Sequence, residues 1–131
     1  MSVRPVTKNR KGGAGLEFAL VLPVLLLLIL PIIDFTWFFL NMQHVQEAAW
    51  SGARAGARIK LDDDPVAVAE AMAKASLEAS MPAYAASATC TATIDGDILR
   101  LKVRVPYDSL AGFVKMPTDL YVNYRMRLED P

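Results

Sequence analysis

The sequence predicts an α+β fold: a long amino-terminal membrane-spanning helix that extends into a small domain with one amphipathic helix and a three-stranded antiparallel sheet. Residues 18–40 form an apolar run of 23 residues that only Asp34 interrupts. Residues 65–81 have apolar side chains at helical spacing, and three later stretches alternate apolar and polar residues. A chain of 131 residues has room for one membrane segment and one small domain. We therefore expect a basic leader at 1–12, a transmembrane and extended helix at 13–60, and a head domain at 61–131.

The apolar run is long enough to cross a bilayer, because about 20 residues cross a hydrocarbon core of about 30 Å. The apolar core of a secretory signal peptide is shorter, about 7–15 residues. Residues 1–16 carry four basic and no acidic side chains, whereas residues 41–131 carry ten basic and twelve acidic ones. Basic flanks tend to stay in the cytoplasm, which predicts an inner amino terminus and an outer head domain. The balanced remainder has no basic run, so no nucleic-acid partner is expected.

Glu17 lies at the start of the apolar run, shortly after Gly12, Gly13 and Gly15. A carboxylate inside hydrocarbon costs several kcal/mol unless it is protonated, paired or able to reach the interface. One interpretation places Glu17 at headgroup depth beside the basic leader, with no special role. The other interpretation starts from the order of residues: a basic leader, Gly12, four residues, Glu17, Phe18 and an apolar helix. That order resembles the class III signal of type IV pilin-like proteins, which implies cleavage by a prepilin peptidase after Gly12.

Cleavage after Gly12 would give the spacing between Gly13 and Glu17 a physical use. A new α-amino group at Gly13 is positively charged near neutral pH. Pairing it with a carboxylate, from the same subunit or a neighbouring one, offsets part of the cost of burying that charge.

The far end of the apolar run contains a second acid, Asp34. It lies 17 residues after Glu17, about 26 Å along a helix at roughly 1.5 Å per residue, and Trp37 beside it suits an interfacial position. We expect Asp34 to reach the outer headgroups; the alternative is an intramembrane acid that binds a partner. Pro23 and Pro31 remove backbone donors inside the run, a change that membrane helices tolerate.

Small residues crowd the outer part of the long helix, where Gly52 and Gly56 are four positions apart. This spacing lets another backbone approach closely. The approaching element is either the sheet of the same chain or a helix of another subunit, and the sequence leaves both open.

The segment GAGLEFALVLPVLLLLILPIIDF, followed by EAAWSGARAGAR, resembles TadE-like proteins, the minor pilin or pseudopilin components of tight-adherence (Tad/Flp) pilus systems. The resemblance covers roughly residues 12–58, and it is carried by Glu17-Phe18, Leu22-Pro23, Asp34-Phe35, Ala48-Ala49 and Gly52-Ala53-Arg54. Family members often place an arginine or lysine where this chain has Trp37-Phe38-Phe39, so no charge pair is carried over.

The resemblance implies a structural protein that the prepilin peptidase cuts and that helps to assemble or initiate a type IV pilus used in adhesion. It implies a bacterial inner-membrane location with the carboxy-terminal domain in the periplasm. The implied partners are other pilin or pseudopilin subunits, the prepilin peptidase, the inner-membrane assembly platform and membrane lipid.

The head domain begins with a helix at 65–81, because Asp64 suits an N-cap and Pro65 the first helical position. Strands are expected at 88–94, 98–105 and 120–128, and Asp95-Gly96 predicts a hairpin between the first two. The apolar face of the last two strands must be covered by the 65–81 helix and the outer half of the long helix. The 107–118 loop carries apolar residues that could contact the long helix or another subunit.

The opposite sheet face is predicted to be basic. A solvated face is the main interpretation, and an anion-binding face the alternative, since exposed Arg and Lys mostly contact water. Its candidate residues are Arg100, Lys102, Arg104, Arg125 and Arg127.

No catalytic constellation is evident, so we expect a protein that is not an enzyme and has no cofactor. Cys90 is the only cysteine and His44 the only histidine, and a nucleophilic thiol needs both a histidine and an acid arranged around it. The carboxylate cluster at 62–64 lacks the spacing of a calcium loop, so no metal is expected. The alternative functions are an unprocessed single-pass membrane anchor and a periplasmic anion-binding or sensor module.

Overall fold

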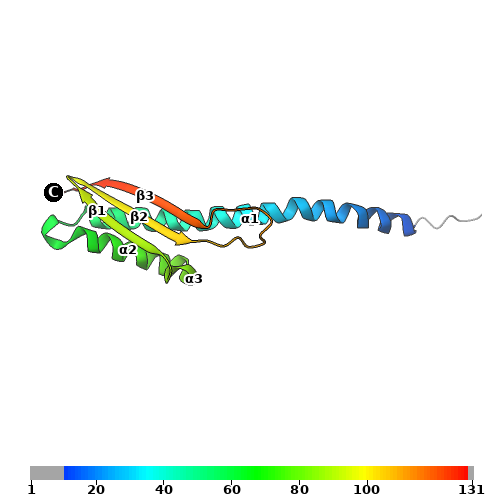
Figure 1. Ribbon diagram of the computed structural model, residues 1–131, viewed down its shortest axis with the longest axis horizontal. Helices are drawn as coiled ribbons and strands as arrows, with labels where there is room; N and C mark the ends of the chain where they lie inside the picture. The colour runs from blue at the N-terminus through cyan, green and yellow to red at the C-terminus, as the bar shows by residue number, and fades with distance from the viewer. Residues whose placement is uncertain (1–10, 130–131) are drawn as a thin grey trace, which may run out of the picture.

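The computed structural model describes residues 11–129, and the side chains of residues 13–129. The expected leader, 1–12, therefore lies almost entirely outside the described residues. Figure 1 shows one long helix that projects far beyond the compact remainder of the chain. The elements, in chain order, are α1 (Lys11–Ala57), the 3-10 turn η1 (Leu61–Asp63), α2 (Pro65–Ser80), α3 (Pro82–Ala85), β1 (Thr89–Asp95), β2 (Ile98–Pro106) and β3 (Asp119–Arg127). The predicted α+β class is confirmed.

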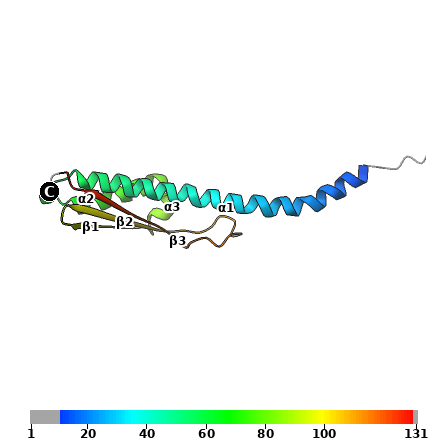
Figure 2. The ribbon, with the colours of Figure 1, turned by 90° about the horizontal axis from the view of Figure 1, so that it is seen from above.

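Helix α1 has 47 residues, so it is about 70 Å long at 1.5 Å per residue. It continues through Pro23 and Pro31, and Figure 2 shows it as a gently curved rod without a break. The helix ends at Ala57, three residues before the predicted boundary. There the Ile59 amide donates to the Gly56 carbonyl at 3.1 Å, which closes a turn in place of a further helical turn.

Helix α2 starts as the sequence predicted. Asp64 has a φ of 54° and its carboxylate accepts a hydrogen bond from the Ala67 amide at 3.1 Å, which satisfies one of the free donors at the helix start. Pro65 occupies the first turn, where its missing N–H costs nothing. The helix ends at Ser80, and the short α3 that follows was not predicted.

The three strands form one antiparallel sheet in the order β1-β2-β3. The hairpin predicted at Asp95-Gly96 joins β1 to β2, with Gly96 at a φ of 64°. Thr93 pairs with Arg100, and Arg100 pairs in turn with Arg125. β2 begins at Ile98 as predicted, and the other strand ends differ from the predicted ones by one residue. β3 stops at Arg127, although the Leu128 amide still bonds back to the Asp97 carbonyl at 2.8 Å.

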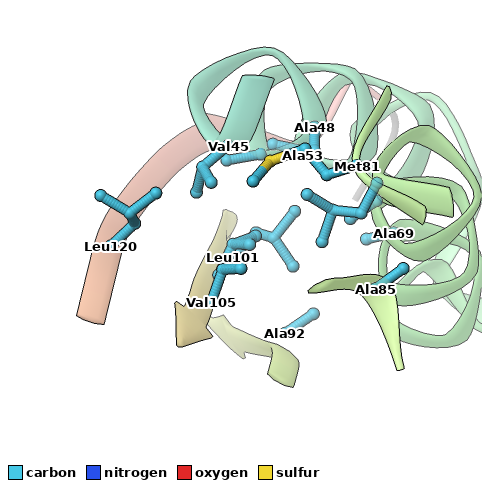
Figure 3. Close-up of a cluster of buried hydrophobic side chains, with 14 of the residues drawn as sticks. Val45, Ala48, Ala53, Ala69, Met81, Ala85, Ala92, Leu101, Val105 and Leu120 are labelled. Atoms are coloured by element: carbon cyan, nitrogen blue, oxygen red, sulfur yellow. The ribbon is translucent and has the colours of Figure 1, made fainter. Parts of the chain in front are cut away.

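The core lies between one face of the sheet and the two long helices. The inward-facing side chains of β2 are all fully buried, as Figure 3 shows for Leu101 and Val105. They meet the outer half of α1 and the buried face of α2, so the head domain shares its core with the long helix. The fully buried members are Val45, Ala48, Ala49 and Ala53 from α1, Ala69, Ala73 and Leu77 from α2, and Leu99, Leu101, Val103 and Val105 from β2.

Candidate functional site

Almost nothing in the described chain packs against the amino-terminal half of α1, residues 13–33, which we call the bare half. Every described side chain from Gly13 to Ile29 is exposed, and nothing in the described chain covers the most apolar 18-residue window of the helix. α1 is long and apolar enough to cross a membrane. Leaving this many leucine, valine and isoleucine side chains in water is unfavourable, so this half of the helix needs lipid or another apolar surface.

Glu17 and Phe18 lie on this uncovered half of α1. The Glu17 carboxylate has no hydrogen-bond or ion-pair partner among the described side chains, those of residues 13–129. A Cβ added at Gly13 or Gly15 would meet nothing within 4 Å, so these glycines do not serve packing inside the chain. Gly12 lies within α1, and its contacts are outside what the structure describes.

Asp34 lies where the bare half of α1 meets the head domain, and its side chain is completely buried. Its Oδ1 atom accepts a hydrogen bond from the Ala111 amide at 2.7 Å. Its Oδ2 atom accepts from the Phe113 amide at 2.9 Å and the Val114 amide at 3.3 Å. Three converging N–H donors stabilise an ionised carboxylate where water cannot reach it.

The loop that supplies these amides connects β2 to β3. The Tyr107 amide donates to the Thr118 carbonyl at 2.8 Å and closes the base of the loop. The Tyr107 ring packs edge-on against Phe38 of α1, with 5.7 Å between ring centroids. Its buried hydroxyl has no hydrogen-bond partner among the described residues, and burial, reinforced by the Asp34 charge, raises the pKa of that hydroxyl.

These contacts correct one prediction and resolve another. The expectation that Asp34 reaches lipid headgroups is wrong, because the loop of its own chain encloses the carboxylate. The 107–118 loop contacts the long helix of the same chain, one of the two alternatives that the sequence left open. The donors are backbone amides, so no residue type marked them in the sequence. Gly112, with a φ of 71°, was the one local signal of a tight bend.

Gly52 and Gly56 lie where α2 and the sheet press most closely on α1. A Cβ at Gly52 would come within 2.6 Å of the Ala69 carbonyl oxygen and 2.8 Å of a Leu101 methyl group. A Cβ at Gly56 would come within 2.6 Å of the Pro65 carbonyl oxygen. This glycine face therefore packs inside the chain, and a helix of another subunit cannot use it while α2 is in place.

The pairing of β2 with β3 brings the five basic residues to one sheet face, with Arg100 opposite Arg125 and Lys102 opposite Asn123. Three of the five have carboxylate partners that sequence reasoning missed. These ion pairs are Arg100 with Asp95 at 2.7 Å, Arg104 with Asp119 at 2.6 Å and Arg127 with Asp97 at 2.7 Å. The acids offset much of the positive charge, which favours the solvated-face interpretation over an anion-binding site.

The remaining candidates are far from one another. Cys90 is half-buried on β1, and His44 is half-buried on α1 beside Met81 and Tyr84. Asp62 and its acidic neighbours are exposed in and after η1. Within residues 11–129, no cluster of three or more His, Cys, Asp or Glu side chains is placed to hold a metal ion.

In the comparison with protein families, residues 12–58 match the family described as TadE-like protein. A search of curated proteins and a search of solved structures found no match. The matched residues coincide with α1, from its first turn to one residue beyond its end. The TadE-like match and the apolar helix together fit a membrane protein associated with the Tad pilus. Residues 12–58, called the TadE-like segment below, are therefore similar to the family that the amino-terminal sequence resembles.

Proposed function

We propose that this protein is a minor pilin or pseudopilin of a Tad/Flp type IV pilus, anchored by α1 and cut by the prepilin peptidase after Gly12. The observation that carries the proposal is the coincidence of the TadE-like segment with one continuous helix. The amino-terminal half of that helix is bare and apolar, and its outer half is built into the core of the head. Because α1 is one continuous helix, it would hold the head domain at a fixed distance from the lipid or the subunits that surround the bare half.

The bare half suits two apolar surroundings in turn. Before assembly, lipid would cover it; during assembly, the helices of neighbouring subunits would replace lipid without exposing apolar side chains to water. Glu17 lies near the inner end of this half with no partner in its own described chain. The free carboxylate supports pairing with an amine at Gly13, in the same subunit or an adjacent one.

The proposed role is structural, and no catalytic step is part of it. The basic leader supports an amino terminus in the cytoplasm, which would place the head domain on the periplasmic side of the inner membrane. The proposed partners are other pilin or pseudopilin subunits, the assembly platform and the peptidase.

The mature amino terminus tests the processing step. Mass spectrometry of the protein extracted from membranes should give a chain that begins at Gly13. Gly12→Val should block cleavage by placing a branched side chain next to the bond to be cut, and the uncut chain should accumulate in the membrane. Gly15→Ala is the matched control, because a Cβ there meets nothing within 4 Å. A wild-type chain that retains residues 1–12 would instead support an unprocessed single-pass anchor.

The role of the acid is tested separately with Glu17→Gln, which keeps the side-chain volume and removes the charge. We expect the variant to remain in the membrane, since the apolar surface is unchanged, while pilus assembly measured by shed filaments falls sharply. Lys102→Gln is a control on the solvated sheet face, where removing a charge should leave assembly unchanged. Normal filament yield from Glu17→Gln would contradict the proposed pairing.

A further inference from the structure

We propose that residues 109–114, which Asp34 holds against α1, form a loop that inserts the Leu110 and Phe113 side chains into the outer boundary of the bilayer that α1 spans. The proposal rests on the membrane anchoring within the proposed function and adds a second contact between the protein and lipid. Asp34 acts as a positioning residue for the loop.

The position of the loop along α1 is the first argument. Residues 13–33 span about 31 Å at 1.5 Å per residue, close to the hydrocarbon thickness of about 30 Å. Asp34 therefore lies at the outer boundary of the hydrocarbon core when the bare half of α1, residues 13–33, spans the membrane. In Figures 1 and 2 the loop between β2 and β3 extends beyond the sheet along α1, toward the bare half of the helix.

The hydrogen bonding of the loop is the second argument. Irregular backbone at membrane depth is unfavourable unless its polar groups find partners inside the protein. Asp34 accepts hydrogen bonds from the amides of Ala111, Phe113 and Val114, at the tip where water would be scarce. The single carboxylate thus satisfies three of the backbone donors that would otherwise oppose entry of this loop into an apolar region.

The exposed side chains of the tip are the third argument. Leu110 is 60% exposed and Phe113 is 55% exposed. The backbone amides of Ala111 and Phe113, in contrast, donate to the buried Asp34 carboxylate. Leu110 also lines, together with residues of α1, an apolar groove of about 200 Å³. The other residues that line this groove are Ile32, Ile33, Thr36, Trp37 and Leu40. The loop tip and the helix therefore present one continuous apolar surface.

Fluorescence quenching in lipid vesicles tests the insertion with the full-length chain. In a Cys90→Ser background, single cysteines replace Leu110 or Phe113 and carry an environment-sensitive fluorophore. The vesicles contain phosphatidylcholine and phosphatidylglycerol, with bromine atoms on the acyl chains as the quencher, and iodide serves as the aqueous quencher. Phe18→Cys is the control inside the anchor, and Lys102→Cys is the control on the exposed sheet face.

We expect labels at 110 and 113 to lose emission to brominated lipid and to be shielded from iodide, as the label at 18 is. The label at 102 should show the reverse. Labels at 110 and 113 that behave like the label at 102, while the label at 18 is lipid-quenched, would overturn the proposal and leave the anchor intact. Loss of lipid quenching at 18 would instead contradict the membrane anchoring itself. Shielding at 110 and 113 from both quenchers, lost on dilution of the protein, would assign the tip to a second subunit and overturn the lipid contact.

The positioning role is tested by adding Asp34→Asn to the labelled Phe113→Cys chain. The carboxamide keeps the size of the side chain but cannot accept all three hydrogen bonds in the same geometry. We expect lipid quenching at 113 to fall and iodide quenching to rise, while the label at 18 in the same variant is unchanged. Unaltered lipid quenching at 113 would overturn the role given to Asp34.

Discussion

The Phe113 backbone N–H donates to the Asp34 carboxylate over 2.9 Å, although the two residues are 79 positions apart in the chain. This bond joins the connection between β2 and β3 to the helix at the boundary between its bare and its buried halves. With the Ala111 and Val114 amides it makes Asp34 the fixed point of the loop. Two sets of contacts therefore hold the head domain against α1: the shared hydrophobic core and the hydrogen bonds to the Asp34 carboxylate.

Removing the carboxylate should release the loop while the core stays folded. We expect Asp34→Asn in detergent micelles to be cut by chymotrypsin after Phe113 much faster than the wild-type protein. The reason is that the carboxamide keeps only one acceptor oxygen and cannot accept all three hydrogen bonds, so the loop opens locally without unfolding of the sheet. The measurement is the rate at which the intact chain disappears on a gel, with the new ends identified by mass spectrometry.

Asp108→Asn is the matched control for that experiment, because it removes a carboxylate of the same loop that is exposed and forms no hydrogen bond or ion pair in the described chain. Its cleavage rate should equal that of the wild-type protein. Equal rates for Asp34→Asn and the wild-type protein would contradict the role of Asp34 in holding the loop.

The features that the sequence predicted well are those that local chemistry determines. Asp64 before Pro65 marks the start of α2, and Asp95-Gly96 marks the hairpin, because an N-cap and a tight turn each depend on a few adjacent residues. The alternation of apolar residues in β2 correctly gave its buried face, since successive side chains of a strand point to opposite sides. The apolar run of residues 18–40 likewise predicted a long apolar helix, and α1 contains it.

The features that could not be predicted depend on contacts between distant segments. Asp34 could have met lipid or protein, and its actual partners are amides 77 to 80 residues away that carry no signature in the sequence. The ion pair of Arg104 with Asp119 required the register of β2 and β3 to be known. Glu70 of α2 accepts a hydrogen bond from the Ala92 amide of the edge strand β1 at 2.7 Å, across 22 positions of the chain.

The ion pair between Arg104 and Asp119 should make stability depend on pH in the acid range. The hydrogen bond from Arg104 lowers the pKa of the Asp119 carboxyl below its ordinary value. A lowered pKa in the folded state means that the contribution is complete above the unfolded pKa of about 3.9 and is lost as the pH falls through the folded pKa. Asp119→Asn should therefore lower the Tm at pH 7, and the difference from wild type should shrink below about pH 4.

A Tm series at several pH values in low and high salt checks this prediction. Because both side chains are partly exposed, added salt should also reduce the difference. Asp62→Asn, at an exposed position of η1, is the control and should show no comparable change. A Tm difference for Asp119→Asn that is constant from pH 2 to pH 7 would rule out the ion pair as its cause.

Cys90 should react slowly with alkylating reagents. Burial, with a smaller effect of the neighbouring Glu70 charge, raises the pKa of its thiol, so less reactive thiolate is present near neutral pH. We expect Thr91→Cys in a Cys90→Ser background, one residue along the strand and exposed, to be alkylated by iodoacetamide faster than Cys90 at pH 7.5. Glu70→Gln should increase the rate at Cys90, and faster alkylation at Cys90 than at position 91 would contradict the burial argument.

Filling the space at Gly52 should destabilise the head domain. The added methyl group of Gly52→Ala would lie 2.6 Å from the Ala69 carbonyl oxygen, so α2 must move away from α1. Overpacking of this kind costs about 1–3 kcal/mol. Denaturant unfolding in micelles, followed by tryptophan fluorescence, measures the loss. Gly15→Ala adds the same group in open space and should cause no loss, and equal stabilities of the two variants would show that Gly52 is not a packing requirement.

A double-mutant cycle should show that Leu101 is one of the side chains that Gly52 accommodates. The Cβ of Gly52→Ala would also lie 2.8 Å from a Leu101 methyl group, whereas Leu99 lies against Gly56 instead. Leu101→Val shortens the side chain, so its combination with Gly52→Ala should lose less stability than the sum of the single losses, by about 0.5 kcal/mol or more. Compensation should be partial, because the Ala69 carbonyl oxygen remains in place. The same cycle with Leu99→Val should be closer to additive; equal coupling in both cycles would mean that α2 alone sets the need for glycine at this position.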